Sequence, residues 1–275
     1  MSHFPIGVPQ DVPPFSNCLH FLPDRHFAQY LRVHNRISVQ TKRRGVSPKR
    51  PKPTCIYCGS RPETTRDHVP PKSLFAPPRP NNLITVPCCI ECRDGQSRDD
   101  EYFVHMLAMR EGTGETPSVR AARDAALRSL MKPAKIGFAR SLLRSISEVE
   151  AYSTAGIYLG QRLSYNVDLD RFTNVIRRTT FGLFFHEYGQ RLPTDHRCQV
   201  YALAGFQSAR QDVTEIMRRF WGHAISGRRR DFGDSVFTYW TRPIDGPEGA
   251  TSWAFVVYGF VPFYAFTGPK LEDMD

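Results

Sequence analysis

The sequence predicts an α+β fold with two parts, a small module held together by cysteines and a larger mixed α/β domain that follows it. Three observations lead to this prediction. Two C-x-x-C pairs lie close together in the first half of the chain. After them, segments with helical and strand-like patterns alternate. The chain has 275 residues, 40% of them hydrophobic, which is enough for one large or two ordinary domains with cores.

The expected division has three segments: an N-terminal arm with a basic linker (1–54), the cysteine module (55–112) and a mixed α/β C-terminal domain without an assigned role (113–275). The arm is rich in proline, and its end carries Lys49, Arg50 and Lys52 between prolines, so it cannot continue a helix. Two interpretations stay open for this basic end. It is either a solvated linker or an arm that contacts phosphates.

Charge and hydropathy favour a cytoplasmic protein that attracts polyanions. The formal net charge is +10, which draws nucleic acids from a distance and makes their binding dependent on salt. The first thirty residues contain no apolar run of signal-peptide type. The longest apolar stretch, residues 253–266, is interrupted by Gly259 and Pro262 and is too short to cross a bilayer. We therefore expect no secretion and no membrane partner.

The cysteine pairs predict a structural metal site. Cys55 and Cys58 form the first pair and are followed by Gly59, which suits a tight turn; Cys89 and Cys92 form the second. Four thiolates are the tetrahedral set that structural Zn²⁺ prefers, and such a closed set leaves no open position for catalysis. Cys88 is next to the second pair, but only Cys89 gives the two-residue spacing.

Between the pairs, residues 64–73 read TTRDHVPPKS and residues 81–87 read NNLITVP. With the two cysteine pairs around them, these motifs resemble the zinc-containing members of the HNH endonuclease family. The resemblance covers about residues 55–102 and depends on several motifs in the right order. It implies a zinc-stapled ββα-metal (His-Me finger) module, with a two-stranded ribbon, a helix, and a catalytic metal held between them.

The resemblance also implies roles for single residues. His68 is expected to be the general base that takes a proton from the attacking water, and Asp67 a ligand of a catalytic Mg²⁺ or Mn²⁺. Asn82 is expected to orient the histidine. Beyond the resemblance, the nuclease hypothesis expects Lys72 to hold the phosphate backbone. Consecutive strand residues point to opposite faces, so Asp67 and His68 can share a site only if Pro70 and the proline after it end the strand there.

One position departs from the family pattern. The residue directly after the last cysteine, usually an asparagine or histidine that completes the catalytic metal site, is Arg93, and arginine cannot ligate a cation. Asp94 is the nearest replacement. The next helix is expected to begin with a capping box of Ser97 and Asp100. Its inward stripe is expected to consist of Phe103, Met106 and Leu107.

The C-terminal domain is expected to alternate helices and strands. The expected helices cover 121–131, 135–148, a long segment capped by Asp170 that ends near Gly189, and 212–221; the strands cover 156–166, 200–206, 236–241 and 252–258. Arg228–Arg230 read as a loop whose charges are solvated or touch phosphate.

The leading functional hypothesis is a metal-dependent endonuclease that hydrolyses phosphodiester bonds of nucleic acid, with DNA as the expected substrate. Two alternatives stay open. One is a zinc-stapled nucleic-acid-binding protein that has lost catalysis, for which Arg93 is the main motive. The other is a nuclease effector that acts with a protein partner in defence against foreign DNA. In that case, the C-terminal domain supplies the docking surface for the partner or for a second copy.

Overall fold

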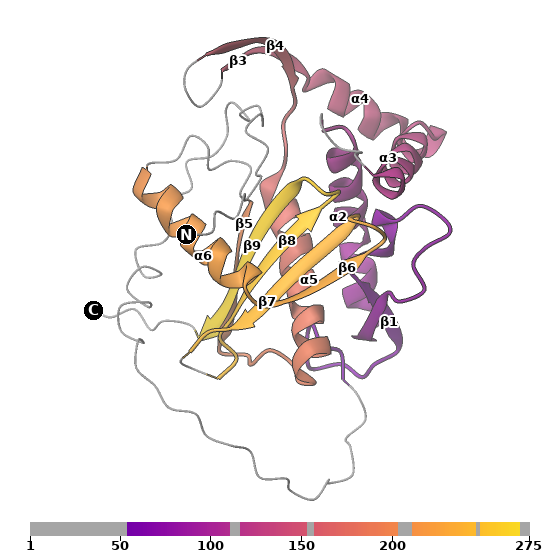
Figure 1. The fold of residues 1–275 in the computed structure, drawn as a ribbon. Coiled ribbons are helices and arrows are strands. Elements are labelled where there is room, and N and C mark those ends of the chain that lie inside the picture. Colours follow the sequence, from indigo (N-terminus) through magenta and orange to yellow (C-terminus); the bar gives the residue numbers. More distant parts are fainter. Residues whose placement is uncertain (1–53, 111–115, 153–156, 203–210, 246–247, 270–275) are drawn as a thin grey trace, which may run out of the picture.

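The computed structural model describes residues 54–110, 116–152, 157–202, 211–245 and 248–269. These residues form a β-hairpin followed by a long helix, a second hairpin with two helices, and a five-stranded antiparallel sheet with further helices (Figure 1). The α+β class is therefore confirmed. The expected N-terminal arm, with Lys49, Arg50 and Lys52, lies outside the described residues.

The first hairpin consists of β1 (Thr65–Val69) and β2 (Ile84–Cys88), with the short 3-10 helix η1 (Lys72–Leu74) in the connection between them. The strands pair antiparallel, and His68 lies opposite Thr85. Helix α2 (Ile90–Ala108) begins two residues after β2, with Cys89 as its N-cap. The chain order strand, strand, helix is thus present in residues 65–108.

The start of α2 differs from the expectation. The helix begins at Ile90, so Ser97 and Asp100 lie inside it and do not form its capping box. The Ser97 hydroxyl donates to the Asp94 carbonyl within the helix, and Asp100 is bound by an arginine, as described below. Phe103, Met106 and Leu107 are buried as expected, but they are not a stripe on one face, because residues 102–108 are all buried.

The next segment contains two short helices and a second hairpin. Helix α3 (Pro117–Leu130), the 3-10 helix η2 (Pro133–Lys135) and helix α4 (Ile136–Arg144) precede β3 (Ser147–Tyr152) and β4 (Tyr158–Ser164). The expected break at Pro133 is present. The expected continuation of the helix to residue 148 is wrong, since the chain enters β3 at Ser147.

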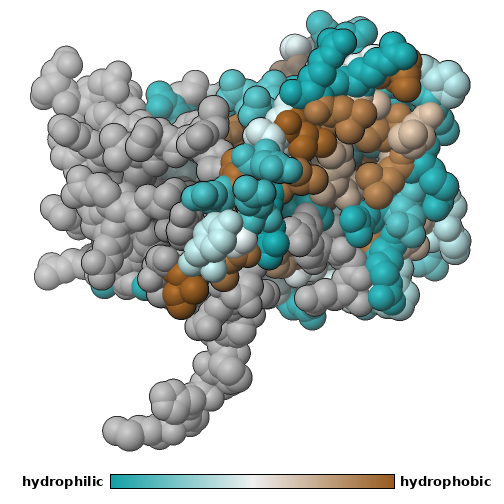
Figure 2. Space-filling view, turned by 90° about the horizontal axis from the view of Figure 1, so that it is seen from above, coloured by the Kyte–Doolittle hydropathy of each residue, from teal (hydrophilic) through white to brown (hydrophobic). Residues whose placement is uncertain are grey.

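This second hairpin lies at one end of the molecule (Figure 1). Seen from that end, hydrophobic areas stand between hydrophilic ones (Figure 2). In residues 131–163 the structure exposes several large hydrophobic side chains: Met131, Ile136, Leu143, Leu159 and Leu163.

Helix α5 (Leu169–Tyr188) is the long helix expected from the sequence, but its N-cap residue is not the expected one. Its N-cap is Asp168, whose carboxylate accepts from the backbone N–H of Arg171, while Asp170 lies in the first turn. The helix ends at Gly189, which has φ 69°, a left-handed conformation that glycine adopts without steric cost.

The sheet has the strand order β5-β9-β8-β7-β6. Its strands are β5 (His196–Ala202), β6 (Arg228–Phe232), β7 (Phe237–Pro243), β8 (Thr251–Val257) and β9 (Val261–Pro269). Two of them were not expected: the arginines read as a loop form edge strand β6, and β9 follows the turn at Gly259. Helix α6 (Gln211–Ile225) was expected in a shorter form.

The two faces of the sheet are covered by different helices. Trp253 and Phe255 of β8 belong to the main core, which includes α5, whereas Ala254 belongs to a smaller cluster with α6. The main core also includes the first hairpin and α2. The Phe103 ring lies 4.8 Å from that of Phe172 and 5.8 Å from that of Phe263, measured between centroids. Residues on both sides of the expected boundary at 112/113 therefore share one core.

Across the described ranges, no helix combines the length and the hydropathy that crossing a membrane requires.

Candidate metal centre and the Asp67–His68 strand

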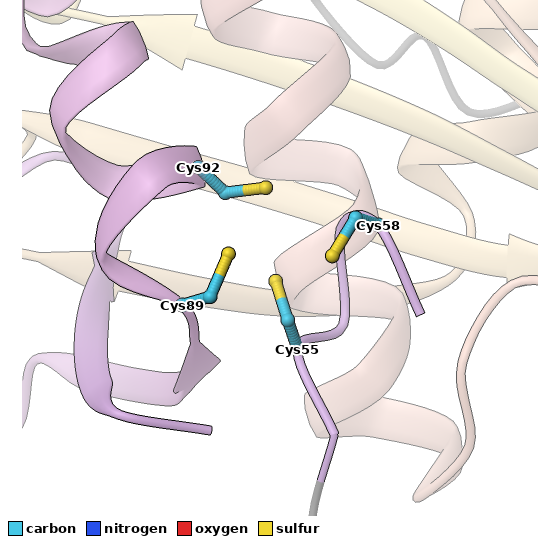
Figure 3. Close-up of side chains that lie close together, drawn as sticks. All are labelled: Cys55, Cys58, Cys89 and Cys92. Atoms are coloured by element: carbon cyan, nitrogen blue, oxygen red, sulfur yellow. The ribbon is translucent and has the colours of Figure 1, made fainter. Parts of the chain in front are cut away.

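The two cysteine pairs form one cluster. The Sγ atoms of Cys55, Cys58, Cys89 and Cys92 all lie within 4.8 Å of one another. Figure 3 shows the four side chains directed toward a common centre, two from the turn before β1 and two from the start of α2. Four convergent sulfur ligands can hold a metal ion such as Zn²⁺. The predicted four-cysteine cluster is thus confirmed, and Cys88 lies outside it.

Backbone contacts hold the two halves of the cluster together. The Gly59 N–H donates to the Cys55 carbonyl at 2.9 Å, which closes the first turn, and Gly59 has φ 68°. The Ile56 N–H donates to the Pro87 carbonyl at 3.1 Å, so the turn is tied to β2. From the C-terminal half, Arg191 Nε donates to the Ile56 carbonyl at 2.9 Å. The metal centre is therefore braced by residues far along the chain.

The thiols differ in acidity for reasons that the structure shows. Hydrogen bonds from Ser60 and Arg61 lower the pKa of Cys58 to about 6, and this favours the thiolate that a metal needs. Burial raises the pKa of Cys88, which keeps this thiol protonated, and its Sγ donates to the Cys89 carbonyl. Burial raises the pKa of Cys92 in the same way, so acidity does not separate Cys88 from the cluster. Cys88 is excluded by its position.

Asp67 and His68 lie on opposite faces of β1. Regular pairing continues through both residues to Val69. Side chains alternate along such a strand, and burial follows this alternation, because Asp67 and Val69 are buried whereas His68 is half-buried. Pro70 ends the strand after Val69, one residue too late to turn the two side chains toward one site.

The Asp67 carboxylate is engaged in a buried polar network. The Tyr57 hydroxyl donates to its Oδ2 at 2.7 Å, and the His68 backbone N–H donates to its Oδ1 at 3.0 Å. Arg178 Nε from α5 lies 3.7 Å from the same Oδ2. Burial, the Asp67 charge and the hydrogen bond to Asp67 keep the pKa of Tyr57 well above its usual value, so Tyr57 remains a donor.

On α2, the carboxylate that joins this network is that of Asp100. Arg178 Nη2 lies 2.6 Å and 2.5 Å from the two Asp100 oxygens. Asp94 lies more than one turn earlier, roughly 9 Å along the axis at ~1.5 Å per residue. Its carboxylate is exposed and pairs with Arg93 Nε at 2.8 Å, and Arg93 Nη1 also donates to Thr65 Oγ1. The expected ligand pair Asp67 and Asp94 thus has other partners.

These contacts decide how well the residues fit a catalytic divalent cation. Within the described part of the chain, the cysteine cluster is the only group of three or more His, Cys, Asp or Glu ligand atoms this close together. The Asp67 oxygens already accept from donors, and the Arg178 guanidinium, 3.7 Å from Oδ2, repels cations. The expected Mg²⁺ or Mn²⁺ site at Asp67 and Asp94 does not fit this arrangement.

His68 lies among cationic side chains on the other face of β1. Burial lowers its pKa, and the positive charges of Lys72 and Arg79 lower it further, against the opposite effect of Asp67. The imidazole is therefore mainly neutral at pH 7, the form that can accept a proton. Asn82 is exposed in the turn before β2, and no hydrogen bond in the described residues joins it to His68.

Sequence reasoning did not identify three members of the network. Tyr57 lies between Cys55 and Cys58 and was given no role, and Asp100 was assigned to a helix cap. Arg178 belongs to a helix whose pattern signals only an apolar face, and no local spacing connects it with Asp67. Only the packing of α5 against β1 brings these residues together.

Comparison of the chain with protein-family models, curated proteins and solved structures gave no match.

Proposed function

We propose that the chain is an HNH-type endonuclease that hydrolyses phosphodiester bonds of nucleic acid, with DNA as its substrate and His68 as the general base. The observation that carries the proposal is the hairpin β1–β2 followed by α2, with the four-cysteine cluster at the junction. On this unit, His68 is half-buried on the outward face of β1 beside Lys72 and Arg79. A neutral imidazole next to two cations suits a phosphodiester substrate.

The proposed chemistry uses the described side chains. The neutral imidazole of His68 takes a proton from water, and the resulting hydroxide attacks phosphorus. As the new P–O bond forms, the P–O bond to the leaving sugar oxygen breaks, and this oxygen takes a proton from solvent water. Lys72 and Arg79 offset the negative charge of the phosphate. Zn²⁺ in the cysteine cluster has a structural role, since four protein ligands leave it no open position. No step is assigned to a divalent cation at Asp67, because that carboxylate is already engaged.

A second candidate is a zinc-stapled nucleic-acid-binding protein without catalysis. It is favoured by the contacts of Asp67 with Tyr57 and Arg178 and by Arg93 at the position that usually completes the metal site. Both candidates predict binding, and only the first predicts cleavage. With either candidate, the C-terminal domain is also proposed to bind a protein partner or a second copy of the chain.

A cleavage assay distinguishes the two candidates. Full-length protein with verified zinc content is incubated with supercoiled plasmid, linear duplex DNA and RNA, each with Mg²⁺, with Mn²⁺ and without added divalent cation. Cleavage in any of these reactions supports the enzyme. Binding without cleavage in all of them contradicts the enzyme and supports the binding protein.

The cations beside His68 are expected to contact phosphates. We therefore expect Lys72→Ala and Arg79→Ala each to reduce the slope of log affinity against log salt by about 0.9, the value for one lost phosphate contact on B-DNA. Fluorescence anisotropy with a labelled duplex measures this slope at several salt concentrations. The matched control is Lys132→Ala, an exposed lysine beside η2 with the same change of charge. Equal slopes in all variants would remove Lys72 and Arg79 from the binding surface.

The same measurement decides between the two interpretations of the basic linker. Replacing Lys49, Arg50 and Lys52 together with alanine should lower the slope by up to about 3 if each contacts a phosphate. A slope equal to that of the wild type makes this segment a solvated linker.

A further inference from the structure

Arg178 is a deeply buried charge beside the proposed nuclease unit. Its side chain is 6% exposed and comes from α5, in the C-terminal half of the chain. Burial by itself would lower the pKa of its guanidinium, but the charges of Asp100 and Asp67 outweigh burial, and the pKa is raised. Arg178 is therefore a permanent cation held between β1 and α2.

The packing of α5 on β1 explains how the guanidinium reaches this place. Residues four apart share one face of a helix, and residues two apart share one face of a strand. Gly182 and Arg178 are such a pair on α5, and Val69 and Asp67 are such a pair on β1. A Cβ at Gly182 would lie 2.4 Å from Val69 Cγ2, so only glycine permits this close approach. This contact places the Arg178 side chain next to the Asp67 carboxylate.

The two carboxylates that flank Arg178 come from the two elements of the proposed nuclease unit. Asp100 accepts two contacts from Nη2, at 2.6 Å and 2.5 Å, and Asp67 lies 3.7 Å from Nε. Burial raises the pKa of Asp100 to about 6, against the effect of Arg178, so the guanidinium keeps an otherwise unfavourable carboxylate ionised at pH 7. Arg178 thus balances two acidic groups in a poorly hydrated place.

We propose that Arg178 is the resident cation of the Asp67–Asp100 pair and takes the position between strand and helix that the family resemblance assigns to a divalent metal ion. The wild-type chain then binds no Mg²⁺ or Mn²⁺ at Asp67. Arg178 is a positioning residue, because it fixes β1, and with it His68, relative to α2. The inference rests on the proposed function, because only in a nuclease of this family is the position between strand and helix a metal site. Its test measures metal binding and stability and does not require cleavage activity.

The first test measures Mn²⁺ binding to full-length, zinc-loaded protein, by electron paramagnetic resonance of the free ion. Wild type, Asp67→Asn, Asp100→Asn and Asp94→Asn are titrated in parallel; the last is a matched control on α2 whose carboxylate is exposed. The expected result is four superimposable isotherms. A stoichiometric Mn²⁺ ion in the wild type that Asp67→Asn or Asp100→Asn removes would overturn the inference.

The second test measures charge compensation by thermal unfolding. Arg178→Met keeps the length of the side chain and leaves two buried carboxylates without a cation, so the midpoint should fall by about 10 °C. Adding Asp100→Asn to this variant should recover at least half of the lost unfolding midpoint. The midpoint of Arg178→Lys should fall less than that of Arg178→Met. An Arg178→Met midpoint equal to that of the wild type would contradict the role of Arg178. If Arg178→Met fails to fold, the midpoint of Arg178→Lys and the Mn²⁺ isotherms still test the role of Arg178.

Failure of this inference and failure of the proposed function give different results. A chain that cuts nucleic acid and also binds Mn²⁺ through Asp67 is a nuclease with an ordinary metal site. A chain that cuts nothing and shows superimposable isotherms retains Arg178 as its resident cation without being a nuclease.

Discussion

Replacing His68 with alanine is expected to reduce cleavage by roughly 100- to 10,000-fold, the usual contribution of a general base. Zinc content and affinity for nucleic acid should stay close to those of the wild type. The reason is that the His68 side chain makes no hydrogen bond to the described residues and is only half-buried, so its loss affects the transition state more than folding. Three measurements on one preparation test this expectation: the initial rate of plasmid cleavage, the zinc content, and the affinity for nucleic acid from fluorescence anisotropy.

The control for this experiment is His186→Ala. His186 lies on α5, and its pKa is also lowered, by partial burial of the ring and by the nearby Arg230 and Arg228. It lies outside the proposed site and should leave the rate unchanged. Equal rates for wild type and His68→Ala would mean that the activity comes from a contaminant or from another site, and the assignment of His68 as base would be abandoned.

The second large effect concerns the cysteine cluster. We expect Cys55→Ser to lower the zinc content from about one ion per chain to nearly none, since a hydroxyl is a much weaker ligand than a thiolate. The free energy of zinc binding contributes to the local stability of the segments that carry the cysteines, so the turn before β1 and the start of α2 should lose protection. Plasma emission spectrometry and amide hydrogen exchange measure the two effects.

Cys88→Ala is the matched control for Cys55→Ser. Cys88 is fully buried and adjacent in sequence to Cys89, but its sulfur lies outside the cluster. This variant should keep its zinc and lose only a modest amount of stability from the smaller side chain. Zinc loss in Cys88→Ala with zinc retained in Cys89→Ala would mean that the second pair has been assigned incorrectly.

The elements that the sequence predicts correctly carry a local signal. The cysteine pairs have ligand spacing, α5 has a regular apolar stripe with Gly189 at its end, and β8 is a continuous apolar run. Strand β6 carries no such signal, because its three arginines resemble a loop. They stand on the edge of the sheet, where charged residues are common. The start of α2 was misplaced because Ser97 and Asp100 match a capping pattern that the Cys89 N-cap replaces.

The candidate site could be predicted only where its residues are close in sequence. The Asp67–His68 pair and the four cysteines belong to one short region. The partners of Asp67 depend on strand alternation and on the docking of α5, which are properties of the tertiary structure. Asp94 was the nearest local substitute for a missing ligand. The α2 carboxylate that shares the Arg178 guanidinium with Asp67 is instead that of Asp100, further along the same helix.

The docking of α5 on β1 also limits how this protein could have been built from parts. Arg178, Gly182 and Arg191 reach from the C-terminal half to Asp67, Val69 and Ile56 of the hairpin region. A gene fragment that ends at residue 112 would separate these partners and leave the Asp67 and Asp100 carboxylates without their counter-ion. The two halves should therefore be inherited together, and a graft of residues 55–112 onto another scaffold should succeed only if a helix with an equivalent arginine and glycine comes with it.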